Sequence, residues 1–235
     1  MHPAKEVGGD FYDFYFVGED YLAITVADVS GKGVPAALFM VIAKTLLKEH
    51  VIMAGSAEKL DEAMRTVNDA LARSNPECMF VTVFLGLLHL PTGVLTYVNA
   101  GHNPPLVRSG EASSSEHSPS FEFLPYSKYP VLGFQEGIAY SKDQLVLSSG
   151  DALFLYTDGV TEAMNGKGEM FSEKRLKETL TCVSIQHGAN LAPGDLLAGL
   201  QAAIGKHVGT VEQSDDITML GLVFHGSGKK GEGHE

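Results

Sequence analysis

The segments of this chain that favour β-strands come in pairs joined by tight turns, and this pairing limits the folds available to it. Residues 11–17 and 21–29 are aromatic and β-branched runs separated by the turn sequence Gly18-Glu19-Asp20. Residues 79–90 and 94–98 repeat the arrangement around a Pro-Thr-Gly turn. This spacing predicts two antiparallel hairpins, because parallel strands need much longer connections.

Segments with helical periodicity also arrive in pairs. Residues 34–50 and 58–73 carry apolar residues at helical spacing. A second helical pair is expected at 172–183, with Ser172 as its N-cap, and at 195–207. Further short strands are expected at 121–124, 144–147, 152–156 and 217–224.

This order of elements favours an α+β domain built from antiparallel sheets over a parallel βαβ fold. The 235 residues suffice for one large core, and no internal repeat or second domain is evident. We therefore expect a single domain over residues 1–225. The Ser-rich stretch 111–120 is expected to form a flexible surface loop, and residues 226–235 a flexible polar tail.

The charge balance narrows the range of partners. The chain has 17 Lys and Arg residues, which are dispersed, against 29 Asp and Glu, and its net charge is −12. These numbers argue against a nucleic-acid-binding surface, which needs clustered basic residues. The longest apolar stretch, 34–47, is too short to span a bilayer, so no membrane insertion is expected. Cys78 and Cys182 have no metal-binding spacing, and we expect free thiols in the reducing cytoplasm.

Four short motifs place aspartates in turns at the ends of the expected strands. Carboxylates brought from several strand ends to one point suit hard divalent cations such as Mg²⁺ or Mn²⁺, which prefer oxygen ligands. A single Asp-Gly pair is more often a plain turn, so the prediction of a metal centre depends on all four motifs together. They are GGDFYD (8–13), ADVSGKG (27–33), YTDGVTEA (156–163) and SDDIT (214–218).

Other local motifs are weaker. The sequence Ser30-Gly31-Lys32-Gly33 lacks the first glycine and the final Ser or Thr of a phosphate-binding loop, and Lys32 is better described as a solvated loop lysine than as a phosphate contact. His102 either braces its turn or lies at the site. The chain contains no HxxxH, HxH or GxSxG, which argues against zinc hydrolases and serine esterases.

Together, these motifs resemble the SpoIIE/RsbU branch of the PP2C-like (PPM) metal-dependent serine/threonine phosphatases. The resemblance covers nearly the whole chain, and the motifs follow the order and approximate spacing of that family. It is carried by PAKEVGGDFYD (3–13), VADVSGKGVPAALFM (26–40), NAGHNPPL (99–106), LYTDGVTEA (155–163) and DDIT (215–218).

The resemblance implies a PP2C-like α-β-β-α sandwich, with two central antiparallel sheets flanked by helices and two Mn²⁺ or Mg²⁺ ions at one end. Asp28 is expected to bridge the ions, and Asp13 is a candidate supporting residue. The implied catalytic residues are Asp10, Asp28, Asp158 and Asp215. The implied metal ligands are these four, the Val29 carbonyl and, in second place, Asp216.

The resemblance also implies a function: hydrolysis of phosphoserine or phosphothreonine on a bacterial signalling protein, through a bridging water activated by two metals. The implied substrate is an anti-sigma-factor antagonist with a STAS-type fold. Helices at 34–50 and 58–73 are expected to receive signals from an upstream sensor or receiver domain. Related regulators often form homodimers, although no long heptad pattern is present here. The phosphate-clamping arginine of many eukaryotic relatives has no evident counterpart.

Two alternatives stay open on the sequence alone. One is a docking module of this fold that has weak or no turnover and sequesters a signalling partner; the four retained aspartate motifs argue against it without proving catalysis. The other is a two-metal phosphodiesterase that acts on a nucleotide. The acidic balance and the absence of a Gly-rich phosphate loop argue against that second alternative.

Overall fold

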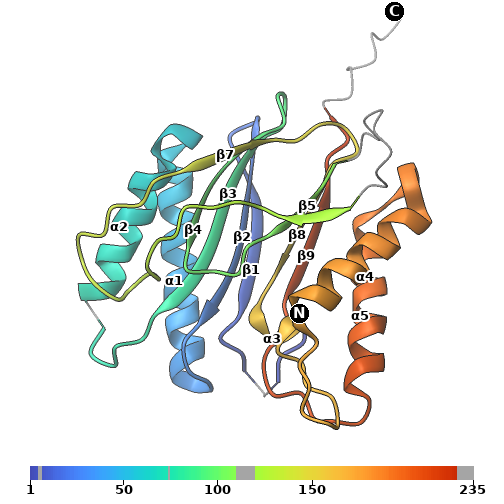
Figure 1. The fold of residues 1–235 in the computed structure, drawn as a ribbon. Helices are drawn as coiled ribbons and strands as arrows, with labels where there is room; N and C mark the ends of the chain where they lie inside the picture. The colour runs from blue at the N-terminus through green and yellow to red at the C-terminus, as the bar shows by residue number, and fades with distance from the viewer. Residues whose placement is uncertain (5–6, 74, 110–119, 227–235) are drawn as a thin grey trace, which may run out of the picture.

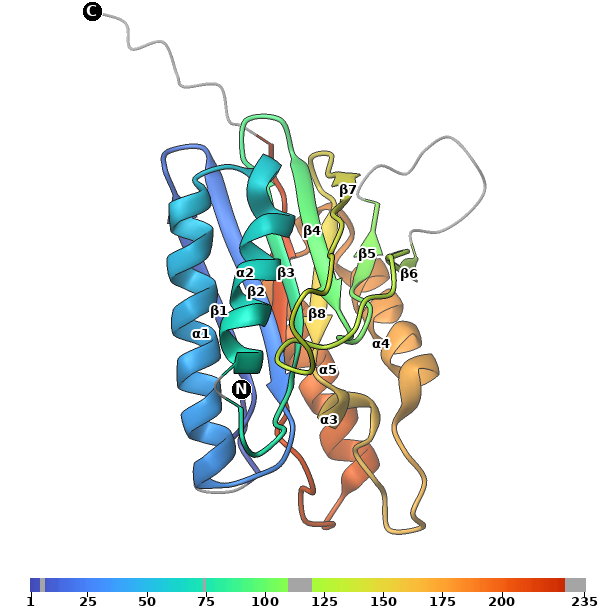
Figure 2. The same ribbon diagram turned by 90° about the vertical axis from the view of Figure 1, so that its left-hand side faces the viewer.

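The computed structural model describes residues 1–4, 7–73, 75–109 and 120–226, which form four stacked layers (Figure 1). Two β-sheets face each other in the centre, and a pair of helices covers the outer face of each (Figure 2). The predicted α-β-β-α sandwich with two central antiparallel sheets is therefore confirmed.

The first sheet contains five strands, all paired antiparallel, in the spatial order β1-β2-β3-β4-β7. The predicted hairpin at its edge is confirmed, with Phe11 opposite Ala27 and Val17 opposite Tyr21. The strands are β1 (Phe11–Val17), β2 (Tyr21–Val29), β3 (Val81–His89), β4 (Val94–Ala100) and β7 (Asp143–Val146).

The second sheet contains four antiparallel strands in the spatial order β6-β5-β8-β9. Its central strand β8 is buried along its whole length and matches the predicted strand 152–156. The strands are β5 (Leu106–Arg108), β6 (Phe121–Phe123), β8 (Ala152–Tyr156) and β9 (Met219–Val223).

Two helices cover the first sheet and two cover the second (Figure 1). The first pair is α1 (Val34–Ala54) and α2 (Leu60–Arg73), joined through the short 3₁₀ helix η1 (Ala57–Lys59). The second pair is α4 (Ser172–His187) and α5 (Pro193–Val208), joined through η2 (Gly188–Asn190). A single-turn helix, α3 (Asp158–Thr161), follows β8 after Thr157.

Three apolar layers hold the sandwich together. Leu47 lies in the layer between α1, α2 and the first sheet, Phe84 in the layer between the sheets, and Leu180 in the layer between the second sheet and α4, α5. Full burial of one such side chain stabilises a fold by about 1.5–3 kcal/mol. The layers extend along the strands and therefore fix the strand ends that carry the aspartate motifs.

Several helix boundaries differ from the sequence prediction, among them the end of α1 and the cap of α4. α1 continues to Ala54, where Gly55 adopts a left-handed conformation with φ of 66° and donates its N–H to the Val51 carbonyl. The prediction of Ser172 as an N-cap is wrong: Ser172 is the first residue of α4, and no side chain caps the helix. The buried Phe171 occupies the cap position instead and donates its N–H to the Ala163 carbonyl, so core packing sets the start of the helix.

The predicted flexible loop at 111–120 and tail at 226–235 fall on residues 110–119 and 227–235, which lie outside the described residues. Both cysteines are exposed free thiols, as predicted. In the part of the chain that the structure describes, no helix has the length and apolar character needed to cross a membrane.

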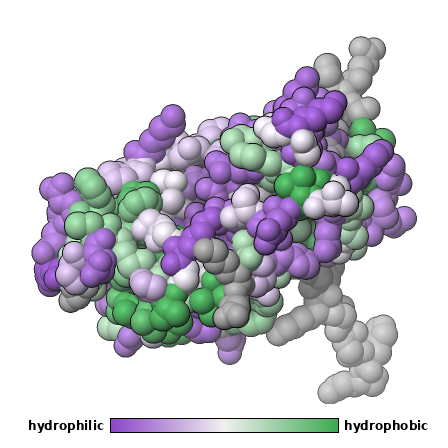
Figure 3. Space-filling view, turned by 90° about the horizontal axis from the view of Figure 1, so that it is seen from below, coloured by the Kyte–Doolittle hydropathy of each residue, from purple (hydrophilic) through white to green (hydrophobic). Residues whose placement is uncertain are grey.

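The outer face of α1 is unusually apolar. Seen from below, hydrophobic surface gathers over the first part of this helix (Figure 3). The exposed residues that form this face are Val34, Leu38, Val41, Ile42, Ile52 and Met53.

Candidate metal centre

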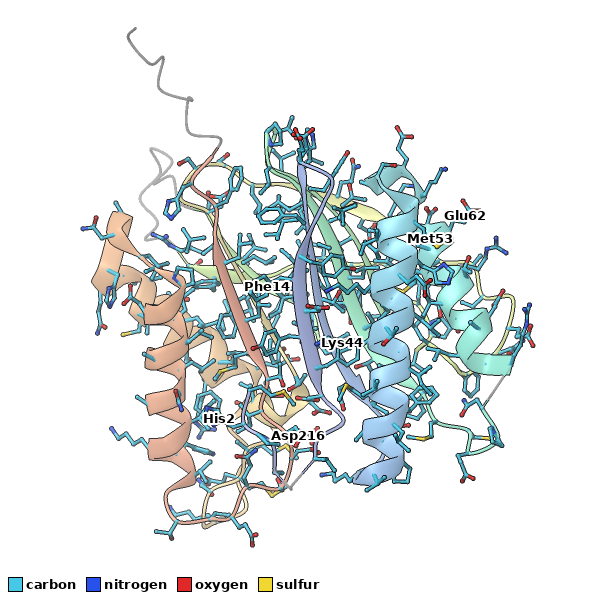
Figure 4. The ribbon with its side chains drawn as sticks, turned by 180° about the vertical axis from the view of Figure 1, so that it is seen from behind. His2, Phe14, Lys44, Met53, Glu62 and Asp216 are labelled. Carbon is cyan, nitrogen blue, oxygen red and sulfur yellow. The ribbon has the colours of Figure 1, made fainter. Side chains whose placement is uncertain are left out.

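The four aspartate motifs meet at one end of the sandwich, where β2 and β8 end and β1 and β9 begin (Figures 1 and 4). Both sheets contribute. Asp10 and Asp28 belong to the first sheet, at the start of β1 and near the end of β2. Asp158 follows β8, and Asp215 and Asp216 precede β9 in the second sheet.

Asp10, which is buried, and Asp28, which is half-buried, form the inner part of this end. Burial raises the pKa of Asp10 to about 7, although a hydrogen bond from Thr157 opposes the shift. Burial also raises the pKa of Asp28 to about 8, and repulsion from Asp10, Asp158 and Asp215 adds to it. The two carboxyl groups lie within hydrogen-bonding reach of each other. Like charges therefore crowd around Asp28, which is the situation that a cation relieves.

Asp158 and Asp215 form the more exposed outer part. Burial, and then repulsion from Glu162 and Asp215, raise the pKa of Asp158. Asp215 forms an ion pair with Lys32, whose Nζ lies 2.9 Å from Oδ2, and the two side chains are 41% and 44% exposed. Lys32 also donates to the Ser214 carbonyl at 2.7 Å. Lys32 is thus exposed, as predicted, but it is bound to one of the four aspartates.

Asp216 has a structural task in this arrangement. Its carboxylate accepts hydrogen bonds from the backbone N–H groups of Ala4 at 2.8 Å, Gly9 at 2.9 Å and Asp10 at 3.4 Å. The chain packs tightly around it, since a Cβ on Gly8 would overlap the Asp216 carboxylate and a Cβ on Gly159 would overlap its carbonyl oxygen. Asp216 therefore fixes the loop that carries Asp10.

Thr157 joins the two sheets, and sequence reasoning gave it no role. Its hydroxyl donates to Asp10 Oδ2 at 2.7 Å and accepts the backbone N–H of Thr218 at 3.1 Å. The hydroxyl of Thr218 is buried, has no hydrogen-bond partner at ordinary distance, and lies near enough to Asp10 to lower its pKa. The only sequence signal for Thr157 is its place directly before Asp158.

Val29 and Asp13, two other residues singled out from the sequence, lie at different distances from the aspartate cluster. The Val29 carbonyl oxygen faces Gly9, beside the Asp10 loop. Asp13 lies away from the cluster, with Oδ2 3.5 Å from Lys48 Nζ of α1.

His102 is 2% exposed, and its Nδ1 lies 2.8 Å from the Thr82 hydroxyl. The backbone of its turn is fixed by two hydrogen bonds with the Asn99 side chain. Burial lowers the pKa of His102 to about 4, a shift that the nearby Tyr156 backbone opposes. These contacts fit the bracing role.

The donor set has the chemistry that a hard divalent cation requires. It consists of carboxylates and a backbone carbonyl, and Asp10 and Asp28 repel each other. Among the described residues, however, no three Asp, Glu, His or Cys side chains lie close enough to enclose an ion as they stand. The structure thus brings Asp10 and Asp28 together, and places Asp158 and Asp215 within electrostatic rather than ligating range of them.

The fold of this chain, with acidic residues from both sheets at one end, is that of the PP2C-like class of phosphatase domains. Solved structures of this class share the fold. The family model for Stage II sporulation protein E (SpoIIE) matches residues 18–225, and the chain belongs to this family. The matched region begins after Asp10. The inclusion of the first aspartate motif in the site therefore depends on the position of Asp10 in the structure and not on the family match.

Curated relatives extend the comparison. The chain is 32% identical to Protein IcfG of Synechocystis sp., over 94% of this chain and 37% of IcfG. It is 30% identical to Phosphoserine phosphatase RsbU of Bacillus subtilis, over 78% of this chain and 52% of RsbU. The chain therefore spans about half or less of the length of these relatives.

Solved structures show the same fold. The crystal structure of the RsbU and RsbW domains of Rv1364c from Mycobacterium tuberculosis superposes with a TM-score of 0.77 at 26% identity, over 94% of this chain and 58% of that one. RsbX, solved in complex with magnesium, superposes with a TM-score of 0.62 at 16% identity, over 95% of this chain and 92% of RsbX. At that identity, the likeness to RsbX concerns the fold alone.

Proposed function

We propose that this chain is a metal-dependent phosphatase domain, formed by residues 1–225, that hydrolyses phosphoserine or phosphothreonine on a bacterial signalling protein. The observation that carries the proposal is the gathering of acidic groups from both sheets around Asp28, whose pKa is raised to about 8 by burial first and then by repulsion from Asp10, Asp158 and Asp215. Membership of the SpoIIE family and similarity to a phosphoserine phosphatase support it.

Two Mn²⁺ or Mg²⁺ ions would be held by four carboxylates and one carbonyl. Asp216 is a weaker candidate ligand than these, because its carboxylate oxygens already accept hydrogen bonds from backbone N–H groups. When bound, such ions lower the pKa of a water molecule for in-line attack on phosphorus and neutralise the phosphoryl oxygens. The proposed ligands are Asp10, Asp28, Asp158, Asp215 and the Val29 carbonyl.

The surrounding residues prepare this centre. Thr157 orients Asp10 through a 2.7 Å hydrogen bond, and Asp216 fixes the backbone on which Asp10 stands. Lys32 holds Asp215 at the rim. Asp158 and Asp215 would supply the remaining carboxylate ligands, although they form no ready three-ligand group with Asp10 and Asp28 among the described residues.

We further propose that the substrate is a phosphorylated anti-sigma-factor antagonist with a STAS-type fold. The similarity to RsbU, named a phosphoserine phosphatase, and to a structure that contains RsbU and RsbW domains supports this choice. An upstream sensor or receiver domain would act through α1 and α2, since α1 begins directly after the loop that follows Asp28. Homodimerisation through such segments belongs to the same proposal.

The alternative is a docking module of this fold with little or no turnover. Two observations favour it: Lys32 already neutralises Asp215, and the described residues contain no ready three-ligand group. A module of this kind would bind a phosphoprotein partner without releasing phosphate.

The test is an assay of the purified chain on a phosphoserine peptide, an aryl phosphate and an aryl phosphodiester, each with Mn²⁺, with Mg²⁺ and with a chelator. We expect cation-dependent release of phosphate from both monoesters and none from the diester. Hydrolysis of the diester alone would support the phosphodiesterase, and binding of the phosphopeptide without turnover would support the docking module.

A further inference from the structure

We propose that a cavity beside the carboxylates is an apolar docking pocket for one side chain of the phosphoprotein substrate, close in sequence to the phosphorylated residue. This inference rests on the proposed function and adds a determinant of substrate specificity to it. The cavity lies where α3 and α5 meet the segment that leads into β9.

The cavity has a volume of about 280 Å³ and a lining that is mostly apolar. This volume is at the lower limit of small-molecule sites, which usually measure about 300–1,000 Å³. It is large enough to accept one leucine, methionine or phenylalanine side chain. Its principal apolar lining residues are Ala163, Met164, Ile204, Val208, Ile217 and Met219.

The cavity is continuous with the candidate metal centre. Asp215, a proposed ligand, and Gly159, which follows Asp158, both form part of its wall. A peptide whose phosphate rests at the carboxylates would place a neighbouring side chain at the cavity within about two residues, because an extended chain advances by roughly 3.3–3.6 Å per residue. None of the described residues that line the cavity is Lys or Arg, so the phosphate itself is a poor occupant.

Hydrogen bonds hold the wall of the cavity in place. The Gln213 side chain donates to the Asp215 carbonyl at 2.7 Å and to the His2 carbonyl at 2.8 Å. The His2 ring lies 3.1 Å from Gln201 of α5, and the His2 backbone pairs with Ile217. Figure 4 shows His2 on the α5 side of Asp216. A pocket fixed in this way needs little ordering when it binds a ligand.

The pocket can be filled without disturbing the fold. Gly205 lies on α5 in the cavity wall, and a Cβ added there would meet no heavy atom within 4 Å. Gly205→Leu therefore introduces an apolar side chain into the space that the substrate would use. Gly194→Leu is the matched control, because Gly194 lies on the same helix, has equally open surroundings and does not line the cavity.

The experiment measures binding and turnover separately. Fluorescein-labelled peptides carry a non-hydrolysable phosphonate analogue of phosphoserine, with leucine or serine placed in turn at each position from three before to three after it. Their dissociation constants are measured by fluorescence polarisation with the full chain, tagged at the C-terminus because His2 lines the cavity. Phosphoserine peptides of the same sequences are assayed for kcat and KM.

We expect leucine at one position within two residues of the phosphonate to tighten binding by about 10- to 100-fold, the effect of burying one such side chain. Gly205→Leu should remove this preference, whereas Gly194→Leu, which lies outside the cavity, should keep it and leave kcat on leucine-free peptides unchanged. Binding that is indifferent to leucine at every position, or a preference that survives Gly205→Leu, overturns the inference. Failure of the proposed function is distinct, because it appears as an absence of phosphate release from every peptide.

Discussion

The inner and outer parts of the aspartate cluster at the end of the sandwich differ in how their negative charges are compensated. Asp10 and Asp28, from the first sheet, are largely buried against each other and have strongly raised pKa values. Asp215, from the second sheet, is substantially exposed and paired with Lys32. Buried like charges cost free energy until a cation arrives, whereas an exposed ion pair contributes little. A bound cation would therefore relieve the repulsion between carboxylates in the inner half, and the outer half would supply further ligands.

Asp28→Asn should have the largest effect, because it removes the charge at the centre of the inner half. We expect phosphatase activity to fall by more than about 100-fold, the upper end of the loss seen when a residue that merely supports a metal ligand is removed. Circular dichroism should show an intact fold, since the apolar layers are untouched. Asp13→Asn is the matched control: it lies on β1 but contacts Lys48 of α1, and it should retain activity.

Asp216→Ala and Asp215→Ala compare adjacent aspartates with different tasks. Loss of the Asp216 carboxylate leaves the backbone N–H groups of Ala4 and Gly9 without their partner, and we expect the free energy of unfolding to fall by about 2–3 kcal/mol. Asp215→Ala removes an exposed ion pair and should cost less than about 1 kcal/mol. Urea denaturation measures both. Equal losses in the two variants would show that Asp216 stabilises the fold no more than Asp215 does.

The metal-free protein should lose stability as the pH rises. The pKa values of Asp10 and Asp28 in the folded state, about 7 and about 8, lie above the ordinary value of 3.8, so the folded protein keeps protons that the unfolded chain has released. Their contribution to stability is thus complete below about pH 4 and is lost as the pH rises through 7 to 8. We expect the free energy of unfolding in chelator to fall progressively between about pH 4 and about pH 8. Asp28→Asn should flatten the profile, and an identical profile in that variant would contradict the assignment.

Lys32→Met should have the smallest effect on stability. Its ion pair with Asp215 is exposed, so we expect the free energy of unfolding to change by less than about 1 kcal/mol. Thermal unfolding in the presence of chelator measures this change. A larger loss would contradict the view that the exposed ion pair of the outer half contributes little to folding.

The strand pairs and the helix pairs were predictable because their signals are local, whereas the four-layer arrangement was implied by the family resemblance. The hairpin of β1 and β2 follows from two apolar runs around a Gly-containing turn. The predicted end of α1 fell four residues short of its actual end at Ala54, before Gly55. The start of α4 was not predictable in this way. There, packing of Phe171 into the core outweighed the capping preference of Ser172.

The site was predictable in its residue types and only partly in its contacts. Aspartates at strand ends are visible in the sequence, but the partners of Asp216 and Lys32 are 212 and 183 residues away along the chain. Such contacts depend on how the two sheets stack, which no local pattern specifies. For the same reason, Thr157 could not be recognised as the link between the sheets.

The central claim is that Asp10 and Asp28, with the outer aspartates, form a binding centre for divalent cations. Titration of chelator-treated protein with Mn²⁺ in an isothermal calorimeter tests it most directly, because it needs no substrate. We predict saturable binding by the natural sequence and by Asp13→Asn, and loss of that binding in Asp28→Asn. Binding of Mn²⁺ by Asp28→Asn with undiminished affinity, or no binding by the natural sequence, would contradict the claim.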